Sequence, residues 1–394
     1  MRIGIFSESY LPIRNGVTVS VTTLTDELTR LGHEVFIFAP AYKGYIDESA
    51  NVIRFPSFRT MMDAEYPIPI PIIPGFYKKV KSLQLDVIHT QSPWLLGWLG
   101  LRMARRLNIP IISTNHTNYP EYSHYFPLAP ASVTKKFIIA LMKKYYNRCD
   151  AVVTPSKQVY QMLMKYGLNR PGYVISTGIS INTFRCDSGG KETRKRYGIP
   201  DDAKVLMYAG RLAKEKNLKL LFDAFDNLAA QFPSMYLMVV GNGPSEDECR
   251  QIASRSLHSD RIILTGSVSR QEIVNYYSAG DIFAFPSITD TQGLVLCEAL
   301  QAGLPCVAVN AGGSPEMICD GIDGLLAENN VADFTAKINL LMDSNELLSS
   351  YSEQAVKNSM RFTANDMAVR MLAVYESASN LSTQDKCLTI RPPL

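Results

Sequence analysis

Short apolar runs alternate with segments of helical length along most of the chain. The runs are rich in Val, Ile and Phe and are closed by Gly, Ser, Thr or Pro, a pattern typical of buried parallel strands. The first series lies at 2–6, 34–38, 86–90, 110–114, 150–154 and 172–176, and the second at 204–210, 235–241, 261–266, 281–287 and 305–309. This alternation predicts an α/β fold with two doubly wound parallel sheets, and therefore two Rossmann-like domains.

The polar, glycine-containing stretch 176–184 separates the two series and is the expected joint. We predict an N-terminal domain over 1–178 and a C-terminal domain over 185–360. Residues 363–377 have the pattern of a helix that packs back on the first domain. Ligands of open parallel sheets bind beyond the carboxyl ends of the strands, so we expect the active site in a cleft between the two domains.

The composition is that of a soluble globular protein, with 46% hydrophobic and 20% charged residues. Met1 leads straight into a strand-like run, and no apolar stretch is long enough to cross a membrane, so neither a signal peptide nor a membrane span is expected. The seven cysteines form no C-x-x-C pair. They are typical of the reduced thiols of a cytosolic protein.

Charge is distributed unevenly along the chain. Residues 1–180 contain 20 Lys and Arg against 11 Asp and Glu, whereas residues 181–394 contain 20 against 26. The basic front half is therefore expected to meet an anionic partner, either a membrane surface or a nucleic acid. No recognised nucleic-acid module accompanies the basic residues, and this favours the membrane.

The segment 134–148, TKKFIIALMKKYYNR, is amphipathic. At about 100° per residue, one face collects Phe137, Ile138, Leu141, Met142 and Tyr145, and the other collects Lys136, Lys143 and Lys144, with Lys135 at the edge. Such a helix lies on an anionic lipid surface, or it is a core helix with a solvated lysine face. The charge asymmetry favours the helix that lies on a membrane surface. Glu8, after the first strand, is a further candidate for acceptor or membrane contact.

Basic and glycine-containing segments follow the strands of the second domain. Arg211 and Lys216 come just after the strand 204–210, where two cations can hold a diphosphate; a solvated basic loop is the alternative. The turn VVGNGP (239–244) contains Gly241 and Asn242 and either lets the backbone approach a ligand closely or is a plain tight turn. The same alternatives apply to the glycine-rich segment 310–324.

The stretch ITDTQGLVLCEA (288–299) places the carboxylates Asp290 and Glu298 on either side of a predicted helix start at Gly293. The first free N–H groups of that helix would face an anion. Carboxylates accept pairs of hydroxyl hydrogen bonds, which suits sugar hydroxyls for one acid and ribose hydroxyls for the other. Two surface acids at a helix start are the alternative.

In the first domain, the loop 6–21 lacks G-x-G-x-x-G, which counts against a nicotinamide dehydrogenase. Its Gly16 lies in a turn before a predicted helix, with backbone amides that can face a phosphate or a sugar. His116 directly follows the strand 110–114, where its side chain either projects into the cleft or is structural. No D-x-D metal clamp, P-loop or Ser/His/Asp set stands out in the chain.

Taken together, these segments resemble the retaining glycosyltransferases of family 4, which have the GT-B fold. The match runs in order over nearly the whole chain, through NGV (15–17), GRLAKEKN (210–217), GNGP (241–244) and PSITDTQGLVLCEALQAGLPCVAV (286–309). The segments IFSESYLPIRNGV (5–17), DVIHTQSPWLLGWLG (86–100), NHTNYPEYSHY (115–125) and TQG (291–293) look most like the diacylglycerol glucosyltransferases. Sulfolipid-forming and phosphatidylinositol-mannosyl enzymes are close behind.

The resemblance implies roles for the motif residues. Arg211 and Lys216 would hold the donor diphosphate, Glu298 the ribose, and Asp290, where the family usually has Glu, the donor sugar hydroxyls. His116 would lie near the transferred sugar, and the catalytic set is then His116, Arg211, Lys216 and Asp290. The remaining donor-binding positions implied are Gly16, Gly241, Asn242, Gln292, Gly293, Leu294 and Val295.

The resemblance also implies the reaction. A hexose, expected to be glucose, would move with retention from a UDP-sugar to a lipid hydroxyl of diacylglycerol, without a metal or cofactor, on the inner face of the cell membrane. A soluble glycosyltransferase acting on a sugar or metabolite is one alternative. A phosphatidylinositol mannosyltransferase or a sulfolipid synthase is another. A GT-B epimerase and a non-catalytic sugar-nucleotide binder are alternatives of a different class.

Overall fold

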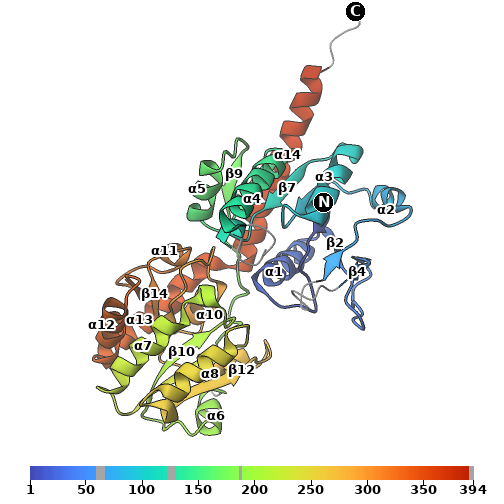
Figure 1. Ribbon diagram of the computed structural model, residues 1–394. Coiled ribbons are helices and arrows are strands. Elements are labelled where there is room, and N and C mark those ends of the chain that lie inside the picture. Colours follow the sequence, from blue (N-terminus) through green and yellow to red (C-terminus); the bar gives the residue numbers. More distant parts are fainter. Residues whose placement is uncertain (59–66, 122–129, 186–188, 390–394) are drawn as a thin grey trace, which may run out of the picture. The chain divides into compact units, whose positions relative to one another are not determined.

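The computed structural model describes residues 1–58, 67–121, 130–185 and 189–389, with side chains up to residue 380. The chain divides into two compact units (Figure 1). Unit 1 contains Met1–Gly178 and the chain from Ala364 onward, and unit 2 is Ile179–Thr363. Each unit holds one large parallel sheet flanked by helices, so the predicted α/β fold with two Rossmann-like domains is confirmed.

The sheet of unit 1 has seven parallel strands in the order β3-β2-β1-β6-β7-β8-β9. Their bounds are β1 Arg2–Phe6, β2 Glu34–Pro40, β3 Val52–Phe55, β6 Val87–Thr90, β7 Ile111–Thr114, β8 Ala151–Thr154 and β9 Gly172–Val174. Sequence analysis missed the edge strand β3, because Arg54 interrupts its apolar run. The short strands β4 (Ser57–Phe58) and β5 (Ile68–Pro69) form a separate antiparallel pair.

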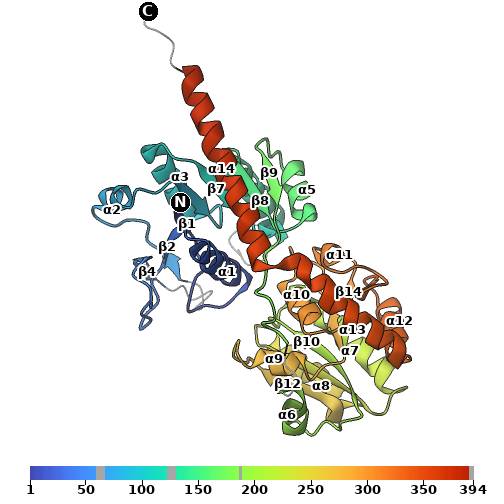
Figure 2. The same cartoon turned by 180° about the vertical axis from the view of Figure 1, so that it is seen from behind.

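Alternate residues of the central strands face opposite sides of this sheet. Ile3 and Ile5 of β1 pack in one cluster with side chains of α1 (Gly16–Arg30) and α14 (Ala364–Thr389). Phe36 and Phe38 of β2 pack in a second cluster on the other face. That face is covered by α2 (Phe76–Ser82), α3 (Leu95–Leu107), α4 (Ala131–Tyr146) and α5 (Lys157–Lys165). Figure 2 shows α14 and α1 together in front of the sheet.

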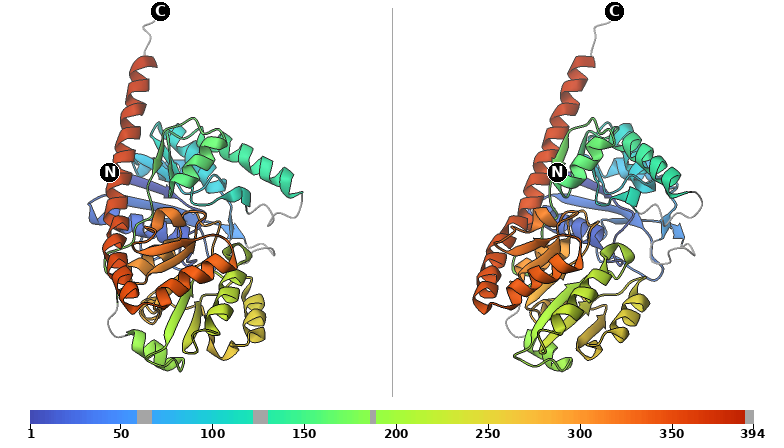
Figure 3. Two further views of the ribbon diagram at one scale, coloured as in Figure 1. Left: turned by 90° about the vertical axis from the view of Figure 1, so that its left-hand side faces the viewer. Right: turned by 60° about the vertical axis from the view of Figure 1, so that its left-hand side comes forward.

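The helix expected over 363–377 is α14, which continues to Thr389 and extends past the sheet of unit 1 (Figure 3). Polar contacts attach it to the sheet inside the core. His89 of β6 is fully buried, with its ring nitrogens 2.8 Å from Tyr375 Oη of α14 and 2.7 Å from Thr114 Oγ1 of β7. Burial lowers the pKa of His89 to about 3, so this histidine is a neutral structural link at physiological pH.

The sheet of unit 2 has six parallel strands in the order β12-β11-β10-β13-β14-β15. Their bounds are β10 Lys204–Ala209, β11 Met235–Val240, β12 Ile262–Gly266, β13 Ile282–Phe285, β14 Cys306–Val309 and β15 Gly324–Ala327. The helices are α6 Gly189–Arg196, α7 Leu218–Ala229, α8 Glu246–Arg255, α9 Ile273–Tyr277, α10 Leu294–Gln301, α11 Ser314–Met317, α12 Val331–Met342 and α13 Asn345–Ser359. Sequence analysis missed β15, a four-residue strand without Val, Ile or an aromatic residue.

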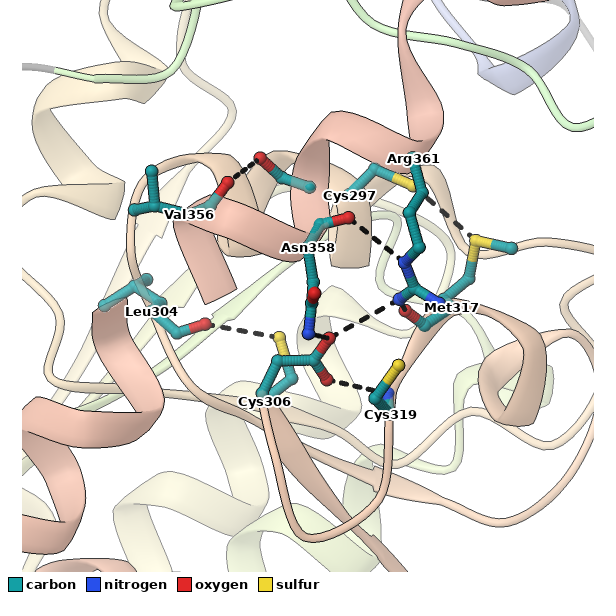
Figure 4. A network of polar contacts seen from close by, with 10 residues as sticks. Cys297, Leu304, Cys306, Met317, Cys319, Val356, Asn358 and Arg361 are labelled. Atoms are coloured by element: carbon teal, nitrogen blue, oxygen red, sulfur yellow. Dashed lines mark hydrogen bonds and ion pairs between the residues drawn. The ribbon is translucent and has the colours of Figure 1, made fainter. Parts of the chain in front are cut away.

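A buried carboxylate fixes the end of α13 to the loop before β15 in unit 2 (Figure 4). Asp323 is fully buried and accepts hydrogen bonds from Cys319 N at 2.7 Å and Asn358 Nδ2 at 3.1 Å. Arg361 Nη2 lies 3.4 Å from the same carboxylate and 3.0 Å from the Met317 carbonyl oxygen. Burial raises the pKa of Asp323, and these partners oppose that shift. The contacts compensate a charge that would otherwise be costly to bury.

Two further properties bear on the predictions. Within the described ranges, no helix combines the length and the apolarity that crossing a membrane requires. The five cysteines whose side chains are described have free thiols, and Cys186 and Cys387 lie outside the described side chains.

Candidate functional site

Four adjacent strands of unit 2 end at one edge of the sheet, and the segments that follow them carry the predicted donor residues. Gly241 follows β11, Arg211 follows β10 and Asp290 follows β13. The glycine-rich segment 310–313 follows β14. Because neighbouring parallel strands present their carboxyl ends at the same edge, this is where a ligand of such a sheet is expected.

The glycines of the 241–244 turn allow two backbone segments to touch. Gly241 has a φ of 136°, and a Cβ there would lie 1.9 Å from the carbonyl oxygen of Gly210. At Gly243 a Cβ would lie 2.3 Å from the carbonyl oxygen of Leu212. Leu212 N donates a hydrogen bond to Asn242 O at 2.8 Å. The backbone of this turn thus positions the segment that contains Arg211, and donor contact by Gly241 and Asn242 stays a prediction.

Lys216 and Asp290 form an ion pair. Lys216 Nζ donates to both carboxylate oxygens, at 2.6 and 2.8 Å, and both side chains are largely buried. Lys216 ends a short 3₁₀ helix, Lys214–Lys216, and Asn217 Nδ2 anchors that helix to the Pro286 carbonyl oxygen at 3.1 Å. On the other side, Gly313 N donates to Asp290 O at 2.7 Å. Three strand-end segments therefore hold this pair together.

The pairing changes the charge balance of the site. Sequence analysis assigned Lys216 to the diphosphate and Asp290 to the sugar, whereas the structure joins the two. The positive charge of Lys216 is balanced by Asp290, with one N–H of the ammonium left for a ligand. The Arg211 guanidinium is exposed and contacts no hydrogen-bond or ion-pair partner among the described residues. Arg211 is therefore an uncompensated cation at this edge.

Glu298 is buried in α10 with a partner for each oxygen. Tyr277 Oη donates to Oε2 at 2.8 Å, and Arg270 Nη1 lies 3.4 Å from Oε1. Burial raises the pKa of Glu298, and the charge of Arg270 and the Tyr277 hydrogen bond oppose that shift. Sequence analysis missed both partners, since neither lies in the motif segments that it singled out; Arg270 comes four residues after β12, and Tyr277 ends α9. Each carboxylate oxygen of Glu298 keeps a lone pair for a ribose hydroxyl. Ribose binding by Glu298 stays a prediction.

The start of α10 lies where sequence analysis placed it. Gly293 caps the helix with a φ of 81°, a left-handed conformation that favours glycine. Leu294 and Val295 are half-buried in the first turn, where helix N–H groups lack intrahelical partners. Gln292 is buried, and its Nε2 lies 3.9 Å from Cys297 Sγ. The side chain of Gln292 thus reaches toward the core of unit 2.

The strand ends of unit 1 hold a second set of predicted residues. Glu8 accepts hydrogen bonds from Leu96 N at 2.7 Å and Gly97 N at 3.4 Å, and from Ser92 Oγ. It therefore caps the N-terminus of α3, where a carboxylate compensates free N–H groups. Burial raises the pKa of Glu8, and these three hydrogen bonds oppose the rise. Sequence analysis did not foresee this capping role, and contact with an acceptor or a membrane stays a prediction.

His116 and Gly16 lie at the same strand-end edge of unit 1. His116 Nε2 is 2.7 Å from Gln91 Oε1, and burial lowers the pKa of His116 to about 4, so its imidazole is neutral at pH 7. Gly16 is the exposed first residue of α1, and Asn15 caps that helix by accepting from Thr18 N at 2.9 Å. Residues 122–125 of the aromatic segment after His116 lie outside the described residues.

Helix α4 shows which side of the predicted amphipathic segment is buried. Of the predicted apolar face, Ile138, Met142 and Tyr145 are buried, whereas Phe137 is 66% exposed. The buried stripe is centred on the other three residues, and Phe137 lies about 100° away from Ile138. Val133 is also exposed, at 56%.

The lysines of α4 lie outside that buried stripe. Lys136, Lys143 and Lys144 are exposed. Lys135 Nζ contacts Glu121 Oε1 at 2.6 Å. The exposed surface of α4 therefore combines three lysines with two large apolar side chains, Val133 and Phe137.

No cluster of three or more His, Cys, Asp or Glu side chains suited to a metal ion occurs in the part of the chain that the structure describes. Transfer without a metal stays a prediction from the resemblance.

Comparison with known proteins identifies the family. The model of Glycosyltransferase Family 4 matches residues 14–183, and that of Glycosyl transferases group 1 matches residues 190–358. An alpha-monoglucosyldiacylglycerol synthase of Streptococcus pneumoniae is 34% identical over 337 residues, which cover 83% of this chain and 75% of the relative. This chain belongs to the family 4 glycosyltransferases.

Other relatives of this glycosyltransferase include both a glucosyl and a mannosyl enzyme. The alpha-monoglucosyldiacylglycerol synthase of Acholeplasma laidlawii is 31% identical, covering 84% of this chain and 85% of the relative. A GDP-mannose-dependent alpha-mannosyltransferase of Corynebacterium glutamicum is 28% identical, covering 85% of this chain and 78% of the relative. The crystal structure of HepE from Anabaena in complex with UDP has a TM-score of 0.76 at 19% identity. The match covers 96% of this chain and 100% of HepE. This last similarity supports the GT-B fold.

The ion pair in unit 2 leads to a prediction about donor affinity. Lys216→Met is expected to weaken binding of a nucleotide-sugar about 100-fold, because it removes one cation and leaves the Asp290 anion unpaired where the diphosphate is predicted to bind. The double variant Lys216→Met/Asp290→Asn should recover about tenfold of that loss, since the second change removes the repulsion. Isothermal titration with the donor measures each step of the cycle.

Lys219→Met is the matched control for this cycle, because Lys219 lies exposed on α7 of the same unit and pairs with Asp223. It should bind the donor like the wild type. Additive effects of the Lys216 and Asp290 substitutions would show that the pair does not act as one unit toward the diphosphate.

Proposed function

We propose that this glycosyltransferase transfers glucose from UDP-glucose to a hydroxyl of diacylglycerol and keeps the anomeric configuration. The observation that carries the proposal is the identity of 34% and 31% to two alpha-monoglucosyldiacylglycerol synthases over more than four fifths of the chain. Glucose in UDP-glucose is α-linked. An α-linked product therefore means that the configuration is retained.

In this proposal the donor binds at the strand-end edge of unit 2. Departure of the nucleoside diphosphate builds up negative charge, and fixed cations placed there stabilise the transition state more than the ground state. Arg211 supplies an uncompensated guanidinium, and Lys216 supplies its remaining N–H. Asp290 stays beside Lys216 and accepts hydroxyls of the sugar, while Glu298 accepts from the ribose.

We assign retention to attack on the donor face from which the diphosphate leaves. Both acids that sequence analysis singled out at this edge are engaged, Asp290 with Lys216 and Glu298 with Tyr277, which disfavours a carboxylate nucleophile from either. The acceptor oxygen then forms the new bond to the anomeric carbon as the bond to the phosphate oxygen breaks. The leaving phosphate takes the hydroxyl proton, and neutral His116 acts as a hydrogen-bonding group for the transferred sugar.

We further propose that the enzyme works at the inner face of the cell membrane. Unit 1 contains the basic half of the chain, and α4 exposes Lys136, Lys143 and Lys144 together with Val133 and Phe137. A helix that presents lysines and large apolar side chains to solvent has the composition of an interfacial helix. The lipid acceptor of the proposed reaction is confined to that interface.

The decisive experiment is a donor and acceptor screen. The purified chain is incubated with diacylglycerol in mixed micelles and with UDP-glucose, GDP-mannose or a UDP-sulfosugar, and the product is analysed by mass and by the anomeric proton coupling in NMR. An α-glucosyl lipid formed only from UDP-glucose is the expected result. A mannosyl or sulfosugar lipid would assign a different donor, and a glycosylated water-soluble acceptor would exclude diacylglycerol. An altered sugar nucleotide would indicate an epimerase. Nucleotide binding without any product would indicate a non-catalytic binder.

A further inference from the structure

A groove of about 670 Å³ lies along α3 in unit 1. Its wall includes Ile72, Leu95 and Trp98, and three arginines also line it, Arg102, Arg105 and Arg148. None of these residues was assigned a role by the family motifs. The groove therefore raises the question of which ligand has both an apolar part and a strong negative charge.

The spacing of residues along α3 creates the groove. Leu95, Trp98, Arg102 and Arg105 recur every three or four residues, so they share one face of the helix. Arg148, which follows α4, joins this face because Arg105 Nη2 donates to its carbonyl oxygen at 2.9 Å. The Arg148 guanidinium lies over the Trp98 ring at 5.6 Å, and Trp98 packs edge-on against Tyr145.

The charge of the groove is uncompensated within the described chain. Arg102, Arg105 and Arg148 are all exposed, and no described acidic side chain pairs with any of them. Three guanidinium groups on one small surface repel one another and create a positive potential that attracts an anion. Their planar forks match the oxygens of a phosphate group.

The apolar wall narrows the choice of anion. Ile72 is 75% exposed and Leu95 is 44% exposed, so a soluble phosphate alone would leave both in water. A single-stranded nucleic acid needs free aromatic faces on which its bases stack. Trp98 does not offer one freely, because its ring is covered by Arg148 and packed against Tyr145.

We propose that this groove binds one anionic phospholipid of the membrane. The phosphate lies among Arg102, Arg105 and Arg148, and the first part of an acyl chain lies against Ile72, Leu95 and Trp98. The site is separate from the lysines of α4 and involves none of the donor residues. The proposal therefore stands or fails independently of the donor, the acceptor and the reaction.

Vesicle flotation without any sugar nucleotide tests the site. Wild-type protein should float with phosphatidylcholine vesicles that contain one third phosphatidylglycerol, and far less with phosphatidylcholine alone. Changing all three arginines to glutamine, R102Q/R105Q/R148Q, should weaken binding to the anionic vesicles about 100-fold, from about fivefold for each cation at a membrane surface. Circular dichroism and the melting temperature check that the variant is folded.

The matched control is K78Q/K79Q/K81Q, which removes the same number of charges from exposed positions of α2 in the same unit, outside the lining of the groove. This variant is expected to keep at least one tenth of the wild-type affinity. Equal losses in the two triple variants would show a diffuse basic surface and overturn the proposal. Unchanged binding of the arginine variant would overturn it as well.

A second variant separates a lipid from free phosphate. Ile72→Asn replaces an exposed apolar side chain with a neutral polar one and should weaken vesicle binding at least tenfold, while a thermal-shift titration with glycerol 3-phosphate stays unchanged. If Ile72→Asn floats like the wild type, the groove recognises phosphate without an acyl chain. If diacylglycerol in neutral vesicles binds as well as phosphatidylglycerol, the groove holds a neutral acceptor instead. Either outcome would refute the anionic-phospholipid assignment.

Discussion

Replacing Arg211 with methionine is expected to lower kcat/KM for sugar transfer about 1000-fold while leaving the melting temperature unchanged. Fixed donors and arginines that meet charge developing in a transition state commonly contribute effects of this size. Lys216 cannot substitute fully, because two of its three N–H groups are directed to Asp290. Stability should not change, since the Arg211 side chain is exposed and pairs with no described residue.

Two further variants make the Arg211 result specific. Arg250→Met removes an exposed arginine of α8 in the same unit, where it pairs with Glu246, and should leave kcat/KM within twofold of the wild type. Arg211→Lys keeps the charge but loses the planar fork, so its activity should fall between those of the wild type and the methionine variant. Steady-state kinetics with product detection by mass measures all three. An Arg211→Met enzyme with more than a tenth of wild-type activity would remove Arg211 from the donor site.

Gly241→Ala is expected to lower the free energy of unfolding of unit 2 by about 3 kcal/mol or more. A Cβ at this position would lie 1.9 Å from the carbonyl oxygen of Gly210, and at a φ of 136° a side chain is strained even where space exists. The obstructing atom belongs to the backbone of a neighbouring turn, so it cannot move aside as a flexible side chain would. For a unit of this size the melting temperature should fall by about 6–12 °C.

Gly266→Ala is the matched control for Gly241→Ala. Gly266 also has a positive φ, 73°, and accepts a hydrogen bond from Gly241 N, but a Cβ there would meet nothing within 4 Å. Its cost should be limited to the backbone strain of about 1–2 kcal/mol. Urea denaturation followed by circular dichroism measures both variants. If the two alanines destabilise equally, the contact between the turns contributes nothing beyond strain.

Sequence patterns located most strands because a run of buried apolar residues is a local property. The patterns failed at β3, where Arg54 interrupts the apolar run, and at β15, which has no Val, Ile or aromatic residue, so the composition of these runs does not distinguish a strand from a loop. They also grouped the exposed Phe137 with the buried Ile138 on one apolar face of α4, since an amphipathic pattern does not reveal where the centre of the buried stripe lies. The boundaries of buried elements were thus predicted better than the orientation of a half-exposed helix.

The sequence by itself determined the α/β alternation, the family and the identity of most candidate site residues, because these depend on residue order and on the spacing of apolar and motif positions. Only the tertiary structure decided which of those residues meet. Lys216 and Asp290 are 74 positions apart, and they pair because β10 and β13 are neighbours in the sheet and end at one edge. The capping of α3 by Glu8 depends likewise on β1 lying beside β6. Strand order brings distant residues together, and no local pattern in a single sequence records that order.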